Sequence, residues 1–134
     1  MAFQRAESPA RLDGYDAAVA FFQGCFPDRR AGTESLFVAH LDQQARCLHL
    51  SRHVGEAGSV DLPVRTIIGD AARFDSAGVI VAHNHPSGDA RPSADDQRAT
   101  RRLAVAAESI DLAVVDHLVF GAADVSSFRR MGLL

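Results

Sequence analysis

An α/β fold, with helices flanking a mixed sheet, is the fold class that the sequence predicts, and three observations lead to it. Helical and extended patterns alternate along the 134 residues. The first two extended segments are joined by a short polar connection, which favours an antiparallel hairpin. A third extended segment, residues 78–82, is a continuous apolar run typical of strands buried on both faces. Together these patterns favour helices packed on a sheet over a helical bundle or a β-barrel.

The N-terminal part is expected to hold a loose tail and one helix. Residues 1–13 are polar and aperiodic, which is typical of a terminal segment without fixed structure. The apolar positions that follow lie at steps of four, three and four, so they share one stripe of a helix. They are Tyr15, Val19, Phe22 and Phe26, and Pro27 is expected to end the helix. We interpret this helix as core material, although its apolar stripe could equally serve a homodimer.

Two strands, a loop and a second helix follow. Residues 34–42 and 46–50 are expected to form the strands of the hairpin. Residues 51–59 are rich in Gly and Ser and are expected to form a loop. Pro63 opens a second helical pattern, because proline is favoured at the first position of a helix. The apolar face of that helix consists of Val64, Ile67, Ile68 and Ala71.

The C-terminal half contains the densest polar stretch of the chain, residues 83–96, directly after the buried strand at 78–82. A third helix is expected over residues 94–110 and a last strand over residues 113–121. No internal repeat or low-complexity segment interrupts this order, so residues 1–134 are interpreted as a single domain.

Composition and charge exclude several classes of function. The chain is 47% apolar and 23% charged, which is ordinary for a folded domain, and its net charge is −3. All 14 basic residues are arginines, so no mechanism can use a Schiff-base or P-loop lysine. The acidic balance also provides no cationic excess for sequence-independent nucleic-acid binding.

The expected location is cytoplasmic, without a membrane partner. Cys25 and Cys47 form neither a C-x-x-C pair nor a disulfide framework, which fits a reducing compartment. No segment has the length of a membrane helix or the composition of a secretory signal.

His83 and His85 are the most informative residues, because they stand where the buried strand runs out into a loop. Residues two apart on an extended chain point to the same face, so the two imidazoles can converge on one ion. Pro86 supports this geometry, since the residue before a proline is kept out of the α region. An isolated H-x-H is more often two exposed histidines in a turn, so the hypothesis needs a third ligand.

Asp96 is the candidate third ligand. Ser93 and Asp96 have the spacing of a helix capping box, which is a purely structural role for both. Asp96 also heads the apolar stripe of the third helix, and a carboxylate turned inward is costly unless it is paired or binds a metal. The neighbouring Asp95 points about 100° away around the helix and is the weaker candidate.

Two imidazoles and one carboxylate form a ligand set typical of catalytic zinc, in which the fourth tetrahedral position is left for water. Zinc lowers the pKa of that water from ~15.7 to ~7, and a general base is then needed for the proton. Glu34 is the candidate base, because it begins a strand and its carboxylate can lie at the end of an apolar surface. For a lone glutamate at a strand start, the default interpretation is a solvated charge.

These residues resemble a known family. His83-x-His85, seven residues, Ser93, two residues and Asp96, with a glutamate upstream, resembles the JAMM signature of JAB/MPN metallopeptidases. The string HNHPSGDARPSADDQRATRRL, followed by VVDHLVFG and SFRRMGLL, resembles the bacterial RadC branch of that superfamily. The resemblance runs from about residue 34 to residue 134. It implies the JAB/MPN fold, a cytidine-deaminase-like mixed β-sheet flanked by helices.

The resemblance also implies an activity and roles for the residues. It implies one zinc ion per chain, held by His83, His85 and Asp96. Glu34 would be the acid and base, and Ser93 would hydrogen-bond the oxyanion of the tetrahedral intermediate. The superfamily hydrolyses peptide or isopeptide bonds, so the expected partner is a peptide or protein substrate.

The chain departs from the RadC pattern in two places. Residues 1–33 do not resemble the helix-hairpin-helix region that such proteins commonly carry at the N-terminus. Where relatives have a stretch resembling R-G-T-x-N, this chain has residues 53–59, which puts substrate contacts along that edge in doubt. Glu56 in this stretch is a second-choice base, ranked below Glu34 because a Gly-flanked loop positions it poorly.

The alternative function is a DNA-repair-associated accessory or interaction protein with a structural or vestigial metal site. Three arginine pairs could contact phosphates, although separate pairs on an acidic protein are more often solvated surface. They are Arg29-Arg30, Arg101-Arg102 and Arg129-Arg130. The letters HNH do not indicate a nuclease, because the residues of that motif are spread over tens of positions. The H-x-E and P-C-x-x-C signature of zinc deaminases is absent.

The remaining polar candidates have weaker signals. His117 either supports the site from behind or is an ordinary strand histidine. His40 and His49 are interpreted as structural residues of the hairpin. Thr100 lies one turn after Asp96 and could hydrogen-bond it. Asn84 is expected to shape the loop.

Overall fold

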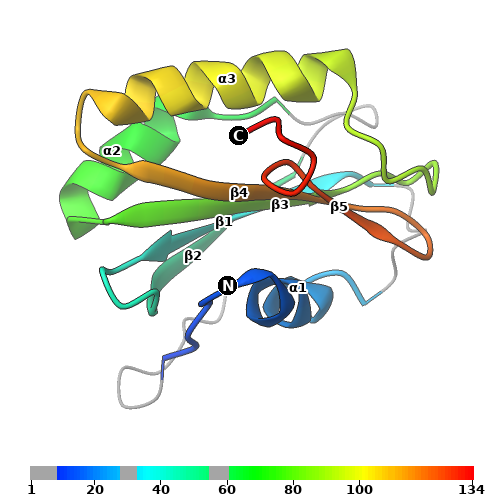
Figure 1. Cartoon of the computed structure of the whole chain (residues 1–134), viewed down its shortest axis with the longest axis horizontal. Helices are drawn as coiled ribbons and strands as arrows, with labels where there is room; N and C mark the ends of the chain where they lie inside the picture. The colour runs from blue at the N-terminus through cyan, green and yellow to red at the C-terminus, as the bar shows by residue number, and fades with distance from the viewer. Residues whose placement is uncertain (1–8, 28–32, 55–60) are drawn as a thin grey trace.

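The computed structural model describes residues 9–27, 33–54 and 61–134, and five strands and three helices lie in these ranges (Figure 1). In chain order they are α1 (Tyr15–Gln23), β1 (Ser35–Leu41), β2 (Cys47–Val54), α2 (Val64–Phe74), β3 (Gly78–Asn84), α3 (Ala94–Glu108), β4 (Ala113–Phe120) and β5 (Val125–Ser127). The strands form one sheet in the order β2-β1-β3-β4-β5.

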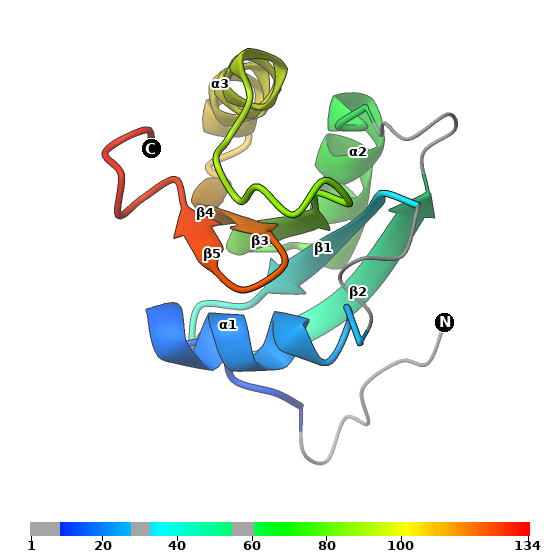
Figure 2. The ribbon, with the colours of Figure 1, turned by 90° about the vertical axis from the view of Figure 1, so that its right-hand side faces the viewer.

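The sheet is mixed, and helices cover both of its faces. β1 is antiparallel to β2 and β3, β3 is parallel to β4, and β5 is antiparallel to β4. Figure 2 shows α1 on one face and α2 and α3 on the other. The predicted α/β class, a mixed sheet flanked by helices, is confirmed.

Two hydrophobic cores follow from the alternation of side chains along the strands. On β1, Phe37 and Ala39 join the core under α1, whereas Leu36 and Val38 join the core under α2 and α3. Phe22 of α1 is fully buried in the first of these cores. The apolar stripe of the first helix therefore serves the core.

The first helix is shorter than predicted. α1 ends at Gln23, and single turns, from the N–H of Cys25 to Phe22 O and from that of Phe26 to Gln23 O, follow it. Phe26 still packs in the core, where its ring lies 5.2 Å from that of Phe37. The apolar spacing thus predicted the burial of Phe26 correctly but not its secondary structure.

The boundaries of two strands also differ from the prediction. Residues 51–54, which were expected to be part of a loop, continue β2, because they pair with residues 35–38 of β1. β3 extends past residue 82 to Asn84, so His83 and Asn84 are strand residues. The three-residue strand β5 was not predicted. Glu56 and the arginine pair at 29–30 lie outside the described residues.

The expectation of a loose tail fails for the residues just before α1. The backbone N–H of Leu12 donates to Ala45 O at 2.7 Å, and that of Cys47 donates to Ala10 O at 2.8 Å. The side chain of Leu12 is buried in the core under α1. This short segment therefore covers the start of the outer edge of β2.

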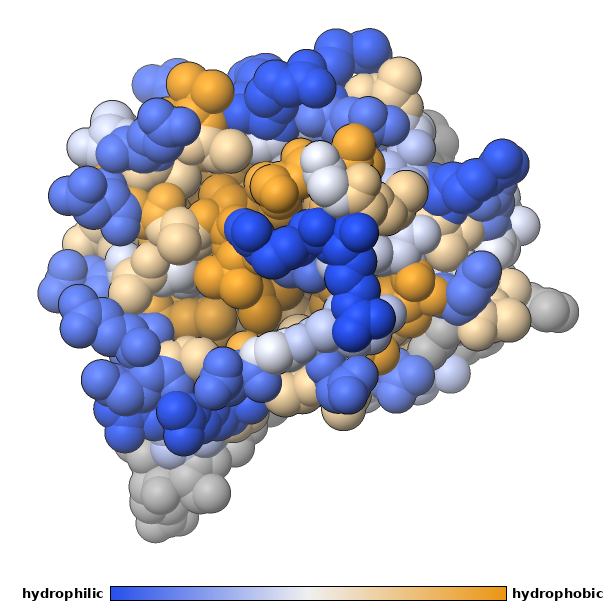
Figure 3. Space-filling view, viewed as in Figure 1, coloured by the Kyte–Doolittle hydropathy of each residue, from blue (hydrophilic) through white to orange (hydrophobic). Residues whose placement is uncertain are grey.

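The residues that follow β5 lie beside β4, where the backbone N–H of Phe128 donates to His117 O and the Arg129 side chain donates to Val115 O. Apolar residues gather in the middle of the face seen in Figure 3. Met131 and Leu133 of the C-terminal segment are 51% and 40% exposed. Homodimerisation stays a prediction.

Among the described residues, no helix combines the length and the apolar character that crossing a bilayer requires.

Candidate metal centre

The sheet topology brings the predicted site residues together at one end of β3. His83 is a buried residue near the end of β3, and His85 follows the strand. Because β1 is antiparallel to β3, with Leu36 opposite His83, the start of β1 and the preceding Glu34 lie beside the two histidines. The first turn of α3 brings Asp96 to the same place.

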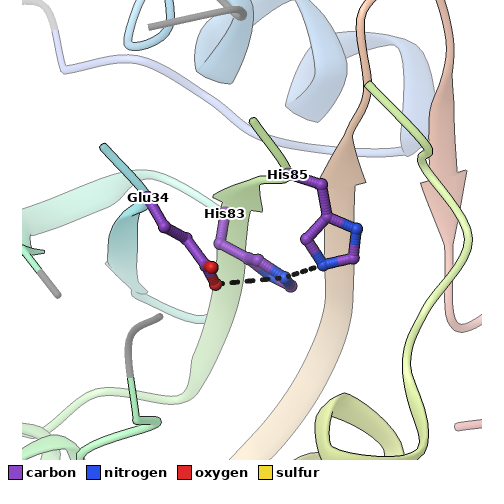
Figure 4. Close-up of side chains that lie close together, drawn as sticks. All are labelled: Glu34, His83 and His85. Carbon is purple, nitrogen blue, oxygen red and sulfur yellow. Dashed lines mark hydrogen bonds and ion pairs between the residues drawn. The ribbon is translucent and has the colours of Figure 1, made fainter. Parts of the chain in front are cut away.

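The side-chain atoms of four residues converge. The Nε2 atoms of His83 and His85 are 3.0 Å apart. One ligand atom each of Glu34, His83 and His85 lies within 4.8 Å of the others, and Figure 4 shows the three side chains meeting. Asp96 contacts both imidazoles, with Oδ2 at 3.1 Å from His85 Nε2 and Oδ1 at 3.5 Å from His83 Nε2. Glu34 Oε1 is 3.9 Å from His83 Nε2.

A chain of buried hydrogen bonds behind His83 sets the position of its proton. The hydroxyl of Thr100 donates to the backbone carbonyl of Asp96 at 2.8 Å, so it must accept from Nδ1 of His117, at 2.6 Å. Nε2 of His117 is then free to accept from Nδ1 of His83 at 2.8 Å. His83 consequently presents an unprotonated Nε2 to the centre. This arrangement matches the role of supporting residue suggested for His117, which is fully buried.

His85 is oriented in the same way from the other side. Its Nδ1 donates to the backbone carbonyl of Asp89 at 2.8 Å, so Nε2 of the neutral ring carries a lone pair. Two imidazole lone pairs and two carboxylates therefore face one another within a few ångströms. Such a donor set repels itself unless a cation or a proton lies among the donors, which makes it a suitable site for a metal ion.

When no cation is bound, a proton on an imidazole nitrogen that faces Asp96 can take its place. Burial opposes ionisation of Asp96, but hydrogen bonds from His83 and His85 outweigh it and hold the pKa of this carboxyl well below its usual range. The hydrogen bond to Asp96 raises the pKa of His85. Burial lowers the pKa of His117 well below 6.5, so His117 is neutral at pH 7, as the hydrogen-bond chain requires.

Ser93 occupies the helix cap that its spacing predicts. Its hydroxyl oxygen accepts from the backbone N–H of Asp96 at 2.9 Å, and Asp96 Oδ2 accepts from the backbone N–H of Ser93 at 2.8 Å. The same Oδ2 atom therefore contacts both the cap and His85. Ser93 also lines the cleft above His85, which has a volume of about 660 Å³.

Other predicted residues lie elsewhere or have different partners. His40 and His49 are opposite each other on β1 and β2, next to Phe74 of α2 and away from the candidate centre. Thr100 hydrogen-bonds the backbone of Asp96 and not its carboxylate. The backbone carbonyl of Asp89 orients His85, and sequence offers no signal for a role played by a backbone carbonyl.

The fold and these side chains define an α/β domain with a candidate metal centre at the end of a central strand. A family model described as RadC-like JAB domain matches residues 12–133. The chain therefore belongs to the RadC-like JAB domain family.

Relatives from several bacteria support this assignment. The UPF0758 protein YfjY of Escherichia coli K12 is 38% identical over 102 residues, which are 75% of this chain and 64% of YfjY. A UPF0758 protein of Idiomarina loihiensis is 41% identical over 107 residues, 79% of this chain and 48% of the relative. A third, from Chloroflexus aggregans, is 33% identical over 126 residues, 93% of this chain and 53% of the relative. The chain thus spans about half to two-thirds of the length of these relatives.

Proposed function

We propose that this chain is a zinc-dependent hydrolase of the JAMM type that cleaves a peptide or isopeptide bond. The observation that carries the proposal is the meeting of His83, His85 and Asp96 with Glu34 at the edge of an open cleft. A set of two histidines and one carboxylate is typical of catalytic zinc, and an adjacent acid can move the proton.

The observed distances favour His83, His85 and Asp96 as the ligands. Ligand atoms at 2.0–2.1 Å from a tetrahedral zinc ion lie about 3.3 Å from one another. The two imidazole Nε2 atoms are 3.0 Å apart, and the Asp96 carboxylate contacts His85 through Oδ2 at 3.1 Å and His83 through Oδ1 at 3.5 Å. Glu34 Oε1, at 3.9 Å from His83 Nε2, is farther away and suits a base beside the ion better than a ligand.

Glu34 and Ser93 would then have different roles in the hydrolysis of the amide bond. A zinc ion held in this way would supply a nucleophile at neutral pH, because zinc lowers the pKa of a water molecule from ~15.7 to ~7, and it would polarise an amide carbonyl. Glu34 would accept a proton from the attacking water and return it to the leaving amine. The Ser93 hydroxyl, whose oxygen accepts a hydrogen bond from Asp96 N–H, keeps its own hydrogen for the oxyanion.

The charge of the cleft favours a polypeptide substrate over a nucleic acid. Five carboxylates, those of Glu34, Asp61, Asp89, Asp95 and Asp96, line it beside one arginine, Arg91. Even with a divalent cation bound, the cleft remains negative. Phosphate groups would be repelled there, whereas a neutral or cationic peptide segment would not.

The alternative, a DNA-associated accessory protein, has little support from the arginine pairs. Arg129 donates to the backbone carbonyls of Val114 and Val115, and the guanidinium of Arg130 lies 3.6 Å from the centre of the Tyr15 ring. Arg101 and Arg102 are exposed on α3 and remain candidates. A mobility shift of labelled DNA at physiological ionic strength would favour this alternative.

Metal analysis of the purified chain is the first test. We expect about one zinc ion per chain in the wild type and in Glu34→Gln, and loss of zinc in His83→Ala and Asp96→Ala. His53→Ala, a histidine of β2 outside the centre, is the matched control and should keep zinc. Retention of zinc in both ligand variants would contradict the assignment.

Hydrolysis is tested on the same set of proteins. Zinc-loaded wild type should cleave amide bonds in a mixture of peptide and isopeptide substrates followed by mass spectrometry. Glu34→Gln should keep zinc but lose turnover, because an amide cannot take the proton. Equal turnover in the two proteins would exclude Glu34 as the base.

A further inference from the structure

We propose that Asn84, the residue between the two histidines, is a positioning residue for Glu34. Its side-chain amide holds the backbone on both sides of Glu34 and thereby fixes the carboxylate beside His83. This inference rests on the proposed function, in which Glu34 moves the proton.

Two hydrogen bonds carry the proposal. Asn84 Oδ1 accepts from the backbone N–H of Ser35 at 2.8 Å, and Asn84 Nδ2 donates to the backbone carbonyl of Thr33 at 3.3 Å. These two backbone groups flank Glu34. The side chain of Asn84 is buried, with 3% of its surface exposed; the bond to Ser35 is shielded from water, and the bond to Thr33 is partly buried.

The position of Asn84 in the sheet explains why it can do this. The backbone pairing of β1 with β3 stops at Leu36 and His83, two residues after Glu34. A side-chain amide offers one carbonyl and one N–H group, as a backbone peptide does. The last backbone pair between the two strands is Leu36 with His83. The Asn84 side chain therefore continues the contact between the strands beyond this pair, to the backbone on both sides of Glu34.

The same residue also belongs to the strand that carries the histidines. Side chains alternate along an extended chain, so the Asn84 side chain points away from those of His83 and His85. The two histidines provide the metal-ligand atoms, and Asn84 provides none. The three-residue segment 83–85 thus contains two candidate metal ligands. Through Asn84 it also binds the backbone on both sides of Glu34. A general base must lie within hydrogen-bond reach of its proton, and a displacement of about 1 Å can cost ~10²-fold in rate.

Two variants remove either both hydrogen bonds or the bond to Thr33 alone. Asn84→Ala removes both of them. Asn84→Asp keeps an acceptor for Ser35 N–H but has no donor for Thr33 O. Val79→Ala is the control, because it also shortens a fully buried side chain of β3 but lies at the other end of the strand.

The first readout is structural and independent of activity. Full-length, zinc-loaded protein is labelled with ¹³C-glutamate, which gives four side-chain resonances because the chain has four glutamates, and Glu34→Gln assigns the one of interest. We expect the Glu34 carboxyl resonance to move in both Asn84 variants and to stay in place in Val79→Ala. Amide hydrogen exchange at Ser35 should become at least about tenfold faster in Asn84→Ala only.

The second readout is turnover at constant metal content. Both Asn84 variants should keep one zinc ion per chain, while kcat falls by about 10²-fold and KM changes little. A general loss of structure would lower zinc content and kcat together and would also affect Val79→Ala. If Asn84→Ala does not fold, Asn84→Asp, which retains the bond to Ser35, provides the test through the Glu34 resonance.

The outcomes separate this inference from the proposed function. Unchanged Ser35 exchange in Asn84→Ala, together with an unmoved Glu34 resonance in both Asn84 variants, would overturn the positioning role, whatever the activity. If the wild type cleaves no amide substrate, the proposed function fails, and the exchange and resonance data still decide whether Asn84 positions Glu34.

Discussion

Thr100 determines which nitrogen of His117 carries a proton, and through His117 it determines the tautomer of His83. Its hydroxyl has one hydrogen, which is donated to the Asp96 carbonyl, so His117 Nδ1 must donate to the hydroxyl oxygen. Hydrogen-bond partners behind a metal-binding histidine commonly set its orientation and basicity. A threonine that contacts no ligand atom of the centre can therefore influence metal affinity.

Thr100→Val tests this influence because valine has nearly the same shape but no hydroxyl. We expect zinc affinity to fall by about 10- to 100-fold, since His117 loses the partner that fixes its tautomer. Stability should also fall, by about 1–3 kcal/mol, because a buried N–H is left unpaired. Competition with a chelator measures the affinity, and Thr66→Val on the exposed side of α2 is the control. An unchanged zinc affinity would show that Thr100 does not influence metal binding through His117.

Ser93 has two assigned roles, helix cap and oxyanion donor, which Ser93→Gly can separate. Glycine at an N-cap costs only a few tenths of a kcal/mol, so the helix should persist. If the hydroxyl stabilises the oxyanion, turnover should still fall by about 10²- to 10³-fold. Urea unfolding and kcat are measured on the same protein. A small loss of turnover would leave the capping box as the whole role of Ser93.

The loop of residues 85–90 depends on a close approach to the end of β4. A Cβ atom at Gly121 would lie 2.6 Å from the carbonyl oxygen of Gly88 and 2.9 Å from the backbone N of Ala90. Gly121→Ala should therefore displace the loop, whose Asp89 carbonyl orients His85. We expect a loss of about 1–3 kcal/mol in stability and weaker zinc binding.

Gly69→Ala provides the control for that substitution. Gly69 lies within α2, and a Cβ atom there meets nothing within 4 Å. Alanine should stabilise this helix by about 0.5–1 kcal/mol, because glycine loses more conformational freedom on folding. Urea denaturation measures the free energy of unfolding of both variants, which should fall in Gly121→Ala and rise in Gly69→Ala. Equal changes in the free energy of unfolding would show that a Cβ atom at position 121 fits without displacing the loop of residues 85–90.

The elements of this fold differ in how far the sequence predicts them. α2, α3 and the apolar strand β3 follow from periodicity and from Pro63 and Ser93 at the helix starts. The second half of β2 does not, because its polar residues are held by pairing with β1 and not by an apolar pattern. The three residues of β5 are too few to give a pattern.

The candidate site shows the same division. The spacing of His83, His85 and Asp96 follows from local geometry, an extended pair and a helix cap, so it can be read from sequence. The contact from Asn84 to the backbone around Glu34 joins residues 49 positions apart. Such side-chain-to-backbone bonds depend on the register of two strands, which no local pattern determines.

At the scale of the whole molecule, acid stability should depend on His40, which lies in the sheet under α2 and outside the candidate centre. Its side chain is fully buried, Nδ1 lies 3.0 Å from the Ser76 hydroxyl, and Nε2 has no hydrogen-bond partner. Burial lowers the pKa of His40 from 6.5 to about 4, against the opposing charge of Asp70. The folded protein therefore resists protonation of His40, whereas the unfolded chain takes up a proton near pH 6.5.

The sign of the pH dependence follows from this difference. Stability is unaffected by His40 above pH 6.5 and falls as the pH drops from 6.5 towards 4, by about 2 kcal/mol between pH 7 and pH 5. His40→Leu cannot titrate, so it should lose about 2 kcal/mol less than the wild type over this range. Urea unfolding at both pH values, with EDTA present so that metal release does not contribute, measures the difference. Identical pH slopes in the two proteins would mean that water reaches His40 in the folded state, and the acid sensitivity of this fold would then have to come from other titratable groups, such as Asp96.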